Sequence, residues 1–165
     1  MSGSVTIALR LNGEDITATV PARESLVDFL RDRMGLTGAH VGCAHGVCGA
    51  CTVRVDGLSV RGCLMLAAQA DGMAVDTVEG LSDSGAMADL QEAFHRHNAL
   101  QCGYCTPGML VTVAELLDRG GPVPDRATIR DHISGNYCRC TGYQSIVDAV
   151  HEVAVARAAT KGDAA

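Results

Sequence analysis

Eight cysteines are the residues of this sequence with the clearest chemistry, and they fall into two groups of four. One group lies within residues 43–63 and the other within residues 102–140. A cysteine thiolate is both a nucleophile and a strong ligand for zinc and iron. Cysteines in a reducing compartment rarely form lasting disulfides, so a cytosolic chain with this many cysteines is typical of metal binding or catalysis. Both groups are therefore candidate metal sites, with four disulfides as the structural alternative.

The first group has the spacing Cys-x4-Cys-x2-Cys, and a fourth cysteine follows after eleven further residues. Its members are Cys43, Cys48, Cys51 and Cys63. This is the plant-type arrangement of thiolates around a cluster of two irons and two sulfides. Glycines between these cysteines let the backbone approach an anionic cluster closely. Structural zinc sites usually show two close pairs of ligands, so zinc is the weaker alternative here.

His45 raises a second alternative, because a Rieske centre replaces two of its cysteine ligands with histidines. That centre needs a second histidine, and Cys51 stands where such a residue would be useful. We therefore expect His45 to be a polar loop residue that tunes the cluster rather than a ligand.

The second group consists of a Cys-x2-Cys pair and a Cys-x-Cys pair. Its members are Cys102, Cys105, Cys138 and Cys140. Thr106-Pro107 predicts a helix start with a threonine N-cap, and residues 141–144 fit a capping box. Two helix N-termini next to the cysteines would stabilise an anionic cluster. Two close pairs are also typical of zinc, so zinc stays open for this group.

The first half of the chain predicts a small mixed sheet that packs on one helix. Residues 25–34 have helical hydrophobic spacing, and Asn12-Gly13 and Asp56-Gly57 indicate tight hairpins. Strands are expected over residues 5–11, 16–20, 52–55, 58–60 and 73–78.

The second half predicts helices. They are expected over residues 87–97, 106–119 and 125–133 and from Thr141 onwards, with a linker over Ser82–Gly85. We therefore expect two domains, 1–80 and 81–165. Domains below about 70–80 residues usually need a disulfide or metal to stabilise them. One metal site in each half would meet that need.

Composition excludes several classes of function. The formal net charge is −6 and no basic cluster is present, which disfavours nucleic acid as a partner. The first seven residues lack a secretory signal pattern, and the longest apolar run, near residues 109–117, is too short for a bilayer. We expect a cytoplasmic protein with no membrane span. No catalytic triad, P-loop or nucleotide fingerprint is present, so we expect no catalytic residue and no complete active site on this chain.

Three segments around the cysteines carry a family resemblance that spans about residues 4 to 157. They read GCAHGVCGACTV (residues 42–53), QCGYCTPGM (residues 101–109) and GNYCRCTGY (residues 135–143). Together they resemble the small iron–sulfur subunit of the molybdenum hydroxylases, a family of xanthine dehydrogenases, aldehyde oxidoreductases, aerobic carbon monoxide dehydrogenases and N-heterocycle dehydrogenases. Tyr104 and Tyr137 stand where that family often has Phe and Leu, and neither is expected to be a ligand.

The resemblance implies an α+β fold, with an N-terminal ferredoxin-like β-grasp domain and a C-terminal four-helix-bundle domain that each hold a 2Fe–2S cluster. It also implies two partners, a large subunit with molybdenum–molybdopterin (the cytosine dinucleotide form) and a medium subunit with FAD, in a heterotrimer or its dimer. Electrons would leave the molybdopterin site through the second cysteine group, pass to the first group and reach FAD.

Individual residues near the second group have two interpretations. Gln101 and Cys140 match positions that lie against the pterin in relatives, although Gln101 could simply be a polar residue that flanks a helix. Arg139 could pair with a cofactor phosphate or a partner carboxylate, or it could be a solvated loop charge.

Two other functions remain open from the sequence. One is a two-subunit enzyme without FAD that donates electrons to a cytochrome-type acceptor. The other is a zinc-stapled adaptor with no redox role.

Overall fold

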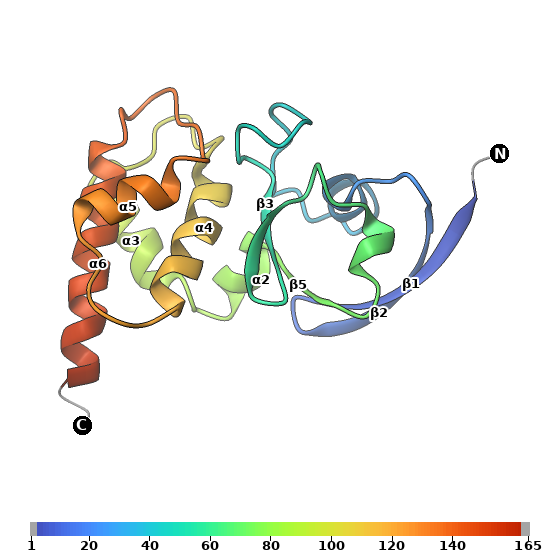
Figure 1. Ribbon diagram of the computed structural model, residues 1–165, viewed down its shortest axis with the longest axis horizontal. Coiled ribbons are helices and arrows are strands. Elements are labelled where there is room, and N and C mark those ends of the chain that lie inside the picture. The colour runs from blue at the N-terminus through green and yellow to red at the C-terminus, as the bar shows by residue number, and fades with distance from the viewer. Residues whose placement is uncertain (1–2, 163–165) are drawn as a thin grey trace.

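A mixed β-sheet and a group of helices lie side by side in the computed structural model, which describes residues 3–162 (Figure 1). Most of the helices occupy one end of the molecule, and the sheet occupies the other. No helix among the described residues is both long and apolar enough to cross a membrane.

The sheet has five strands in the order β2-β1-β5-β3-β4. They are β1 (Ser4–Leu11), β2 (Glu14–Pro21), β3 (Thr52–Val55), β4 (Leu58–Arg61) and β5 (Ala74–Asp76). Strands β1 and β5 pair in parallel, and the other neighbours pair antiparallel. Both expected hairpins are confirmed. Asn12 and Gly13 have φ of 50° and 89°, and Asp56 and Gly57 have 48° and 83°, as a two-residue turn with left-handed backbone requires.

The helix expected over residues 25–34 forms in two parts. A short α1 (Leu26–Asp28) continues into the π-helix η1 (Phe29–Arg33). Ser25 caps it, because its hydroxyl accepts a hydrogen bond from the Asp28 amide at 3.2 Å. The adjacent side chains of Phe29 and Leu30 are both fully buried. Leu26 and Val27 of α1 are buried as well, so both parts of this helix contribute consecutive apolar residues to the core under the sheet.

Five α-helices and one 3₁₀ segment, η2 (Ala67–Ala70), complete the described fold. The helices are α2 (Val78–Asp83), α3 (Ala88–Arg96), α4 (Thr106–Asp118), α5 (Arg126–Ile133) and α6 (Gln144–Gly162). Helix α4 is buried from Gly108 to Glu115 and is the central helix of this half. The buried apolar residues form two separate clusters, one that ends at Val75 and one that begins at Leu81. The sheet and the helices therefore each have a core of their own.

Three details of the sequence prediction are wrong. Residues 82–85 are not a linker, because α2 continues through Ser82 to Asp83. Cys105, not Thr106, is the N-cap of α4. The final helix begins at Gln144 instead of Thr141. In that position the Thr141 hydroxyl lies 3.1 Å from the sulfur of Cys138 and accepts a hydrogen bond from the Tyr143 amide. The two threonines therefore do not cap the helices in the way that the local pattern predicts.

Helix α4 joins the two halves by packing directly on β3, β4 and the loop before them. Its Gly108 lies against that loop so closely that an added Cβ would come within 2.2 Å of the Gly49 carbonyl oxygen. Further along the helix, the buried Glu115 accepts a hydrogen bond from the Ser59 amide at 3.0 Å. Asp118 pairs with Arg54 of β3 at 2.8 Å. The loop before β3 is therefore held between the sheet and the helices.

Substitution of Gly108 by Ala tests this close approach. Ala normally stabilises a helix by about 1 kcal/mol relative to Gly. At Gly108 the added methyl would meet a backbone oxygen that cannot rotate away, and such overpacking costs about 1–3 kcal/mol. We expect a lower midpoint of thermal unfolding for Gly108→Ala. Gly3→Ala, where an added Cβ meets open space, is the control. Equal midpoints for the two variants would contradict the packing described here.

Candidate metal centres

The first cysteine group lies mostly in a loop without regular structure, between η1 and β3. Ala44, Gly46 and Gly49 have positive φ of 55°, 83° and 75°, so the backbone curls around the space between the cysteines. An added Cβ at Gly42 would lie 3.0 Å from the sulfur of Cys48. The loop therefore has the cradle form that a bulky inorganic group needs.

Backbone amides and burial give the thiols of this group different acidities. Hydrogen bonds from the backbone amides of His45 and then Cys48, the latter at 3.4 Å, lower the pKa of Cys43 to about 6. Burial raises the pKa of Cys51 to about 11, and Cys63 lies beside it. The His45 ring bonds the Cys43 carbonyl, which fits the role of a polar loop residue.

The cysteines of the second group come from two places in the fold. Cys102 and Cys105 lie just before α4, and Cys138 and Cys140 lie in the connection between α5 and α6. The sulfurs of Cys102 and Cys140 are 3.6 Å apart and both residues are exposed, and Cys105 lies beside Cys138. Burial raises the pKa of Cys105 to about 12. Burial opposes ionisation of Cys138 as well, but hydrogen bonds from Thr141 outweigh it and lower its pKa.

Both groups have the donor chemistry of a binuclear cluster. All eight cysteines are free thiols, so each group offers four sulfur ligands. Among the described residues, no three His, Cys, Asp or Glu side chains are arranged around a single metal ion. A two-iron cluster divides its four protein ligands between its irons, so pairs of thiols are the expected unit. The pairs brought together here are Cys43 with Cys48, Cys51 with Cys63, Cys102 with Cys140, and Cys105 with Cys138.

The two groups lie next to each other along one edge of the molecule, where the loop before β3 meets the connection between α5 and α6 (Figure 1). The amide of Tyr137 donates a hydrogen bond to the carbonyl of Cys48 at 2.8 Å. A cavity of about 160 Å³ is lined by Cys48 of the first group and by all four cysteines of the second. One hydrogen bond therefore joins a cysteine of the first group to the residue that precedes a cysteine of the second.

Tyr104 makes a second connection between the groups. Its ring stacks on His40 with centroids 4.5 Å apart, its hydroxyl donates to the Val41 carbonyl at 2.9 Å, and its own carbonyl contacts the His40 ring at 2.8 Å. In the sequence Tyr104 is distinguished only as a departure from a family pattern. Neither its sequence neighbours nor its spacing indicates a partner more than sixty residues away.

Two residues of interest in the sequence lie at the exposed side of the second group. The Gln101 side chain donates to the carbonyl of Cys140 at 3.1 Å, so these two residues do come together. Arg139 is exposed, and no carboxylate of residues 3–162 pairs with it. Its charge is therefore available to a partner or a cofactor.

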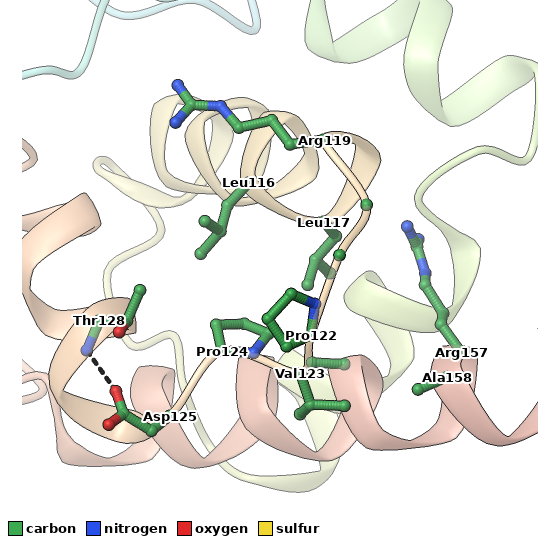
Figure 2. Close-up of a pocket in the computed structure, with 13 residues that line it drawn as sticks. Leu116, Leu117, Arg119, Pro122, Val123, Pro124, Asp125, Thr128, Arg157 and Ala158 are labelled. Atoms are coloured by element: carbon green, nitrogen blue, oxygen red, sulfur yellow. Dashed lines mark hydrogen bonds between the residues drawn. The ribbon is translucent and has the colours of Figure 1, made fainter.

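A larger hollow of about 410 Å³ lies away from the cysteines, between the end of α4, the loop 120–124 and α6 (Figure 2). Its walls are mainly aliphatic, and Asp125 at its rim caps α5 by accepting a hydrogen bond from the Thr128 amide at 2.8 Å. Arg157 is held by two hydrogen bonds of 2.7 Å to Asp89. Because Asp125 and Arg157 have structural partners, the cysteine edge is the better candidate for the chemistry of this chain.

Comparison with known families gives two matches, whose residue ranges together include both cysteine groups. Residues 9–80 match the family described as "2Fe-2S iron-sulfur cluster binding domain", and residues 77–151 match the "[2Fe-2S] binding domain". These matches define an iron–sulfur protein of the 2Fe–2S class.

Relatives that match the chain over most of its length identify the family within this class. The chain is 55% identical over 149 residues to the nicotine 6-hydroxylase small subunit of Paenarthrobacter nicotinovorans, covering 90% of this chain and 89% of that protein. It is 40% identical over 150 residues to the xanthine dehydrogenase iron-sulfur-binding subunit of Escherichia coli O157:H7, covering 90% and 94%. The crystal structure of quinoline 2-oxidoreductase from Pseudomonas putida 86 superposes with a TM-score of 0.89 at 48% identity, covering 98% of this chain and 99% of that one.

The chain therefore belongs to the small iron–sulfur subunits of the molybdenum hydroxylases, as its three cysteine segments predict. Members of this family are subunits of oxidoreductase complexes, and a subunit of this kind serves electron transfer. The structure adds that the two cysteine groups share one edge of the molecule.

The Tyr104 hydroxyl gives a specific test of the contact between the groups. Tyr104→Phe keeps the ring stacked on His40 but removes the hydrogen bond to the Val41 carbonyl, which is worth about 0.5–1.5 kcal/mol. We expect the lower end of that range because Tyr104 is half exposed. Tyr137→Phe is the matched control, since the Tyr137 hydroxyl has no hydrogen-bond partner among the described residues. Denaturant unfolding measures the free energy of unfolding of both variants. An equal loss of unfolding free energy in Tyr104→Phe and Tyr137→Phe would contradict the contact.

Proposed function

We propose that this chain relays electrons from a molybdopterin site on a large partner subunit to FAD on a medium partner subunit, with one 2Fe–2S cluster in each cysteine group. The observation that carries the proposal is the juxtaposition of two four-thiol groups, linked by the hydrogen bond from the Tyr137 amide to the Cys48 carbonyl. When bound, such clusters accept and donate single electrons. The protein's own part is to hold the thiolates, exclude water and fix the separation of the groups.

The ligands we propose for the plant-type cluster are Cys43, Cys48, Cys51 and Cys63, and those for the second cluster are Cys102, Cys105, Cys138 and Cys140. The short approach of Cys102 to Cys140, and the pairing of Cys105 with Cys138, support one iron for each of these pairs. Metals bind thiolates, so loading must remove protons from Cys51 and Cys105, whose pKa values burial raises.

Two domains, 1–80 and 81–165, are proposed to hold the two clusters. The separate buried cores of the sheet and the helices support this division. Val78 packs against the helical core, which supports a change between the domains within a few residues of the proposed boundary.

Exposure supports a partner contact at the second cysteine group. Cys102 and Cys140 are exposed and are accompanied by the exposed apolar side chains of Leu100, Tyr104 and Tyr137. Cys51 in the first group is only 2% exposed. A surface of this kind suits a tight contact with the partner that carries the pterin. Gln101, Cys140 and the unpaired charge of Arg139 are the residues we propose to face it.

An enzyme of two subunits without FAD is the second candidate, in which the first group would donate to a cytochrome-type acceptor. Val47 and Leu64 are exposed beside Cys48 and Cys63, and this apolar border could serve either acceptor. Flavin analysis of the complex purified with its native partners separates the two candidates.

Metal analysis of the purified chain tests the proposal directly. Two binuclear clusters predict about four irons and about four acid-labile sulfides per chain, with negligible zinc. A stoichiometric amount of zinc without acid-labile sulfide would contradict the electron relay and would indicate a zinc-stapled adaptor instead.

Reciprocal serine variants assign the two clusters. Cys102→Ser should abolish the signal of the second cluster in low-temperature EPR while the plant-type signal persists, because the sulfur lost belongs to one group only. Cys63→Ser should give the opposite pattern. The assignment would be wrong if either variant removed only the signal of the other group. Circular dichroism of both variants separates loss of a cluster from loss of the fold.

A further inference from the structure

Asn136 is a buried polar side chain at the junction of the two cysteine groups, with 1% of its surface exposed. Its side-chain amide donates a hydrogen bond to the carbonyl of Gly49 at 3.2 Å. Its side-chain oxygen accepts a hydrogen bond from Arg61 at 3.2 Å and lies 3.2 Å from the Thr112 hydroxyl, which also donates to the Gly108 carbonyl at 2.8 Å. One side chain therefore contacts the first cysteine loop, the end of β4 and helix α4.

The Gly49 carbonyl is itself held firmly by the first domain. It accepts hydrogen bonds from the Thr52 amide at 3.2 Å and from the Thr52 hydroxyl at 2.6 Å. Gly49 lies between the proposed ligands Cys48 and Cys51, and Asn136 lies two residues before Cys138. The hydrogen bond from Asn136 thus connects two proposed ligand segments at a fixed point.

Little space surrounds this connection. An added Cβ at Gly49 would lie 2.7 Å from the Asn136 side chain, and one at Gly135 would lie 2.7 Å from the Arg61 guanidinium. The guanidinium also donates to the Gly135 carbonyl at 2.8 Å. Both backbones therefore meet without room for a methyl group, and we expect loss of the Asn136 contact to shift one segment relative to the other.

We propose that Asn136 is a positioning residue for electron transfer between the two cysteine groups. Its amide seats residues 136–140 on the first cysteine loop, so that the Tyr137 amide reaches the Cys48 carbonyl. Asparagine suits this position because its short side chain has both a donor and an acceptor, and both are used. The inference rests on the proposed two-cluster relay and names the residue that sets the separation of the clusters.

Asn136→Asp removes the donor, keeps the size of the side chain and places a negative charge beside Arg61. The carboxylate still accepts from Arg61, and the guanidinium of Arg61 favours its ionised form. It cannot donate to the Gly49 carbonyl and repels it instead. Thr112→Val is the matched control, because it removes the hydroxyl that lies between the Gly108 carbonyl and the Asn136 side-chain oxygen and leaves the contact of Asn136 with Gly49 in place.

The readout is the magnetic interaction between the two clusters in the full-length chain after complete reduction, measured by low-temperature EPR. Two paramagnetic centres whose ligand segments are in direct contact should split each other's EPR signals in the wild type. We expect Asn136→Asp to lose the splitting while each cluster keeps its own signal. Thr112→Val should retain the splitting even if its midpoint of thermal unfolding falls as far.

An unchanged splitting in Asn136→Asp would overturn the proposal. If that variant does not retain both clusters, Asn136→Ser, whose hydroxyl is too short to reach Gly49, takes its place with the same expected loss. Failure of both variants to hold two clusters, while Thr112→Val holds them, would overturn the positioning role in favour of a role in assembly. A wild-type chain without two reducible clusters would instead refute the proposed function, which keeps the two failures distinct.

Discussion

The close approach of helix α4 to the first cysteine loop is the constraint on which the rest of the molecule depends. Gly108 leaves no room for a side chain against the Gly49 carbonyl, and the same carbonyl receives the amide of Asn136. A helix of one half and a loop of the other therefore meet at backbone distance. The second cysteine group begins at the N-terminus of that helix, so this contact also determines where the two groups lie relative to each other.

The surroundings of the two cysteine groups also affect the negative charge that a bound cluster would carry. Thiolate-bound clusters are anionic, and the loop and the N-terminus of α4 offer backbone amides that stabilise negative charge. The amides of His45 and Cys48 lower the pKa of Cys43, whereas burial raises the pKa of Cys51 and of Cys105. The same polypeptide thus combines amide donors with apolar burial, two properties by which a protein sets the reduction potential of an iron–sulfur cluster.

Much of the fold and the family is predictable from the sequence because the signals are local. Asn12-Gly13 and Asp56-Gly57 specify two hairpins through their backbone preferences, and Asp125 marks the start of α5. The cysteine segments are specific enough to indicate the family by themselves. The division of the helix after Ser25 into α and π turns is not predictable, since the apolar spacing of residues 26–34 fits an ordinary α-helix.

Prediction fails where distant contacts decide the structure. Thr106 and Thr141 fit helix caps on local pattern, but Cys105 is the cap of α4, and α6 begins only at Gln144. The roles of Asn136 and Tyr104 depend on partners more than sixty residues away in the sequence. Asn136 carries no local signal beyond its place beside a cysteine pair, and only the fold shows that its side chain is buried against the other group.

The central claim is that both cysteine groups hold redox-active clusters in one chain. Anaerobic titration of the purified full-length protein with dithionite, followed by visible absorption, tests it most directly. Two binuclear clusters predict bleaching that is complete after uptake of about two electrons per chain. A protein that carries its full complement of metal but takes up no electrons would contradict the account.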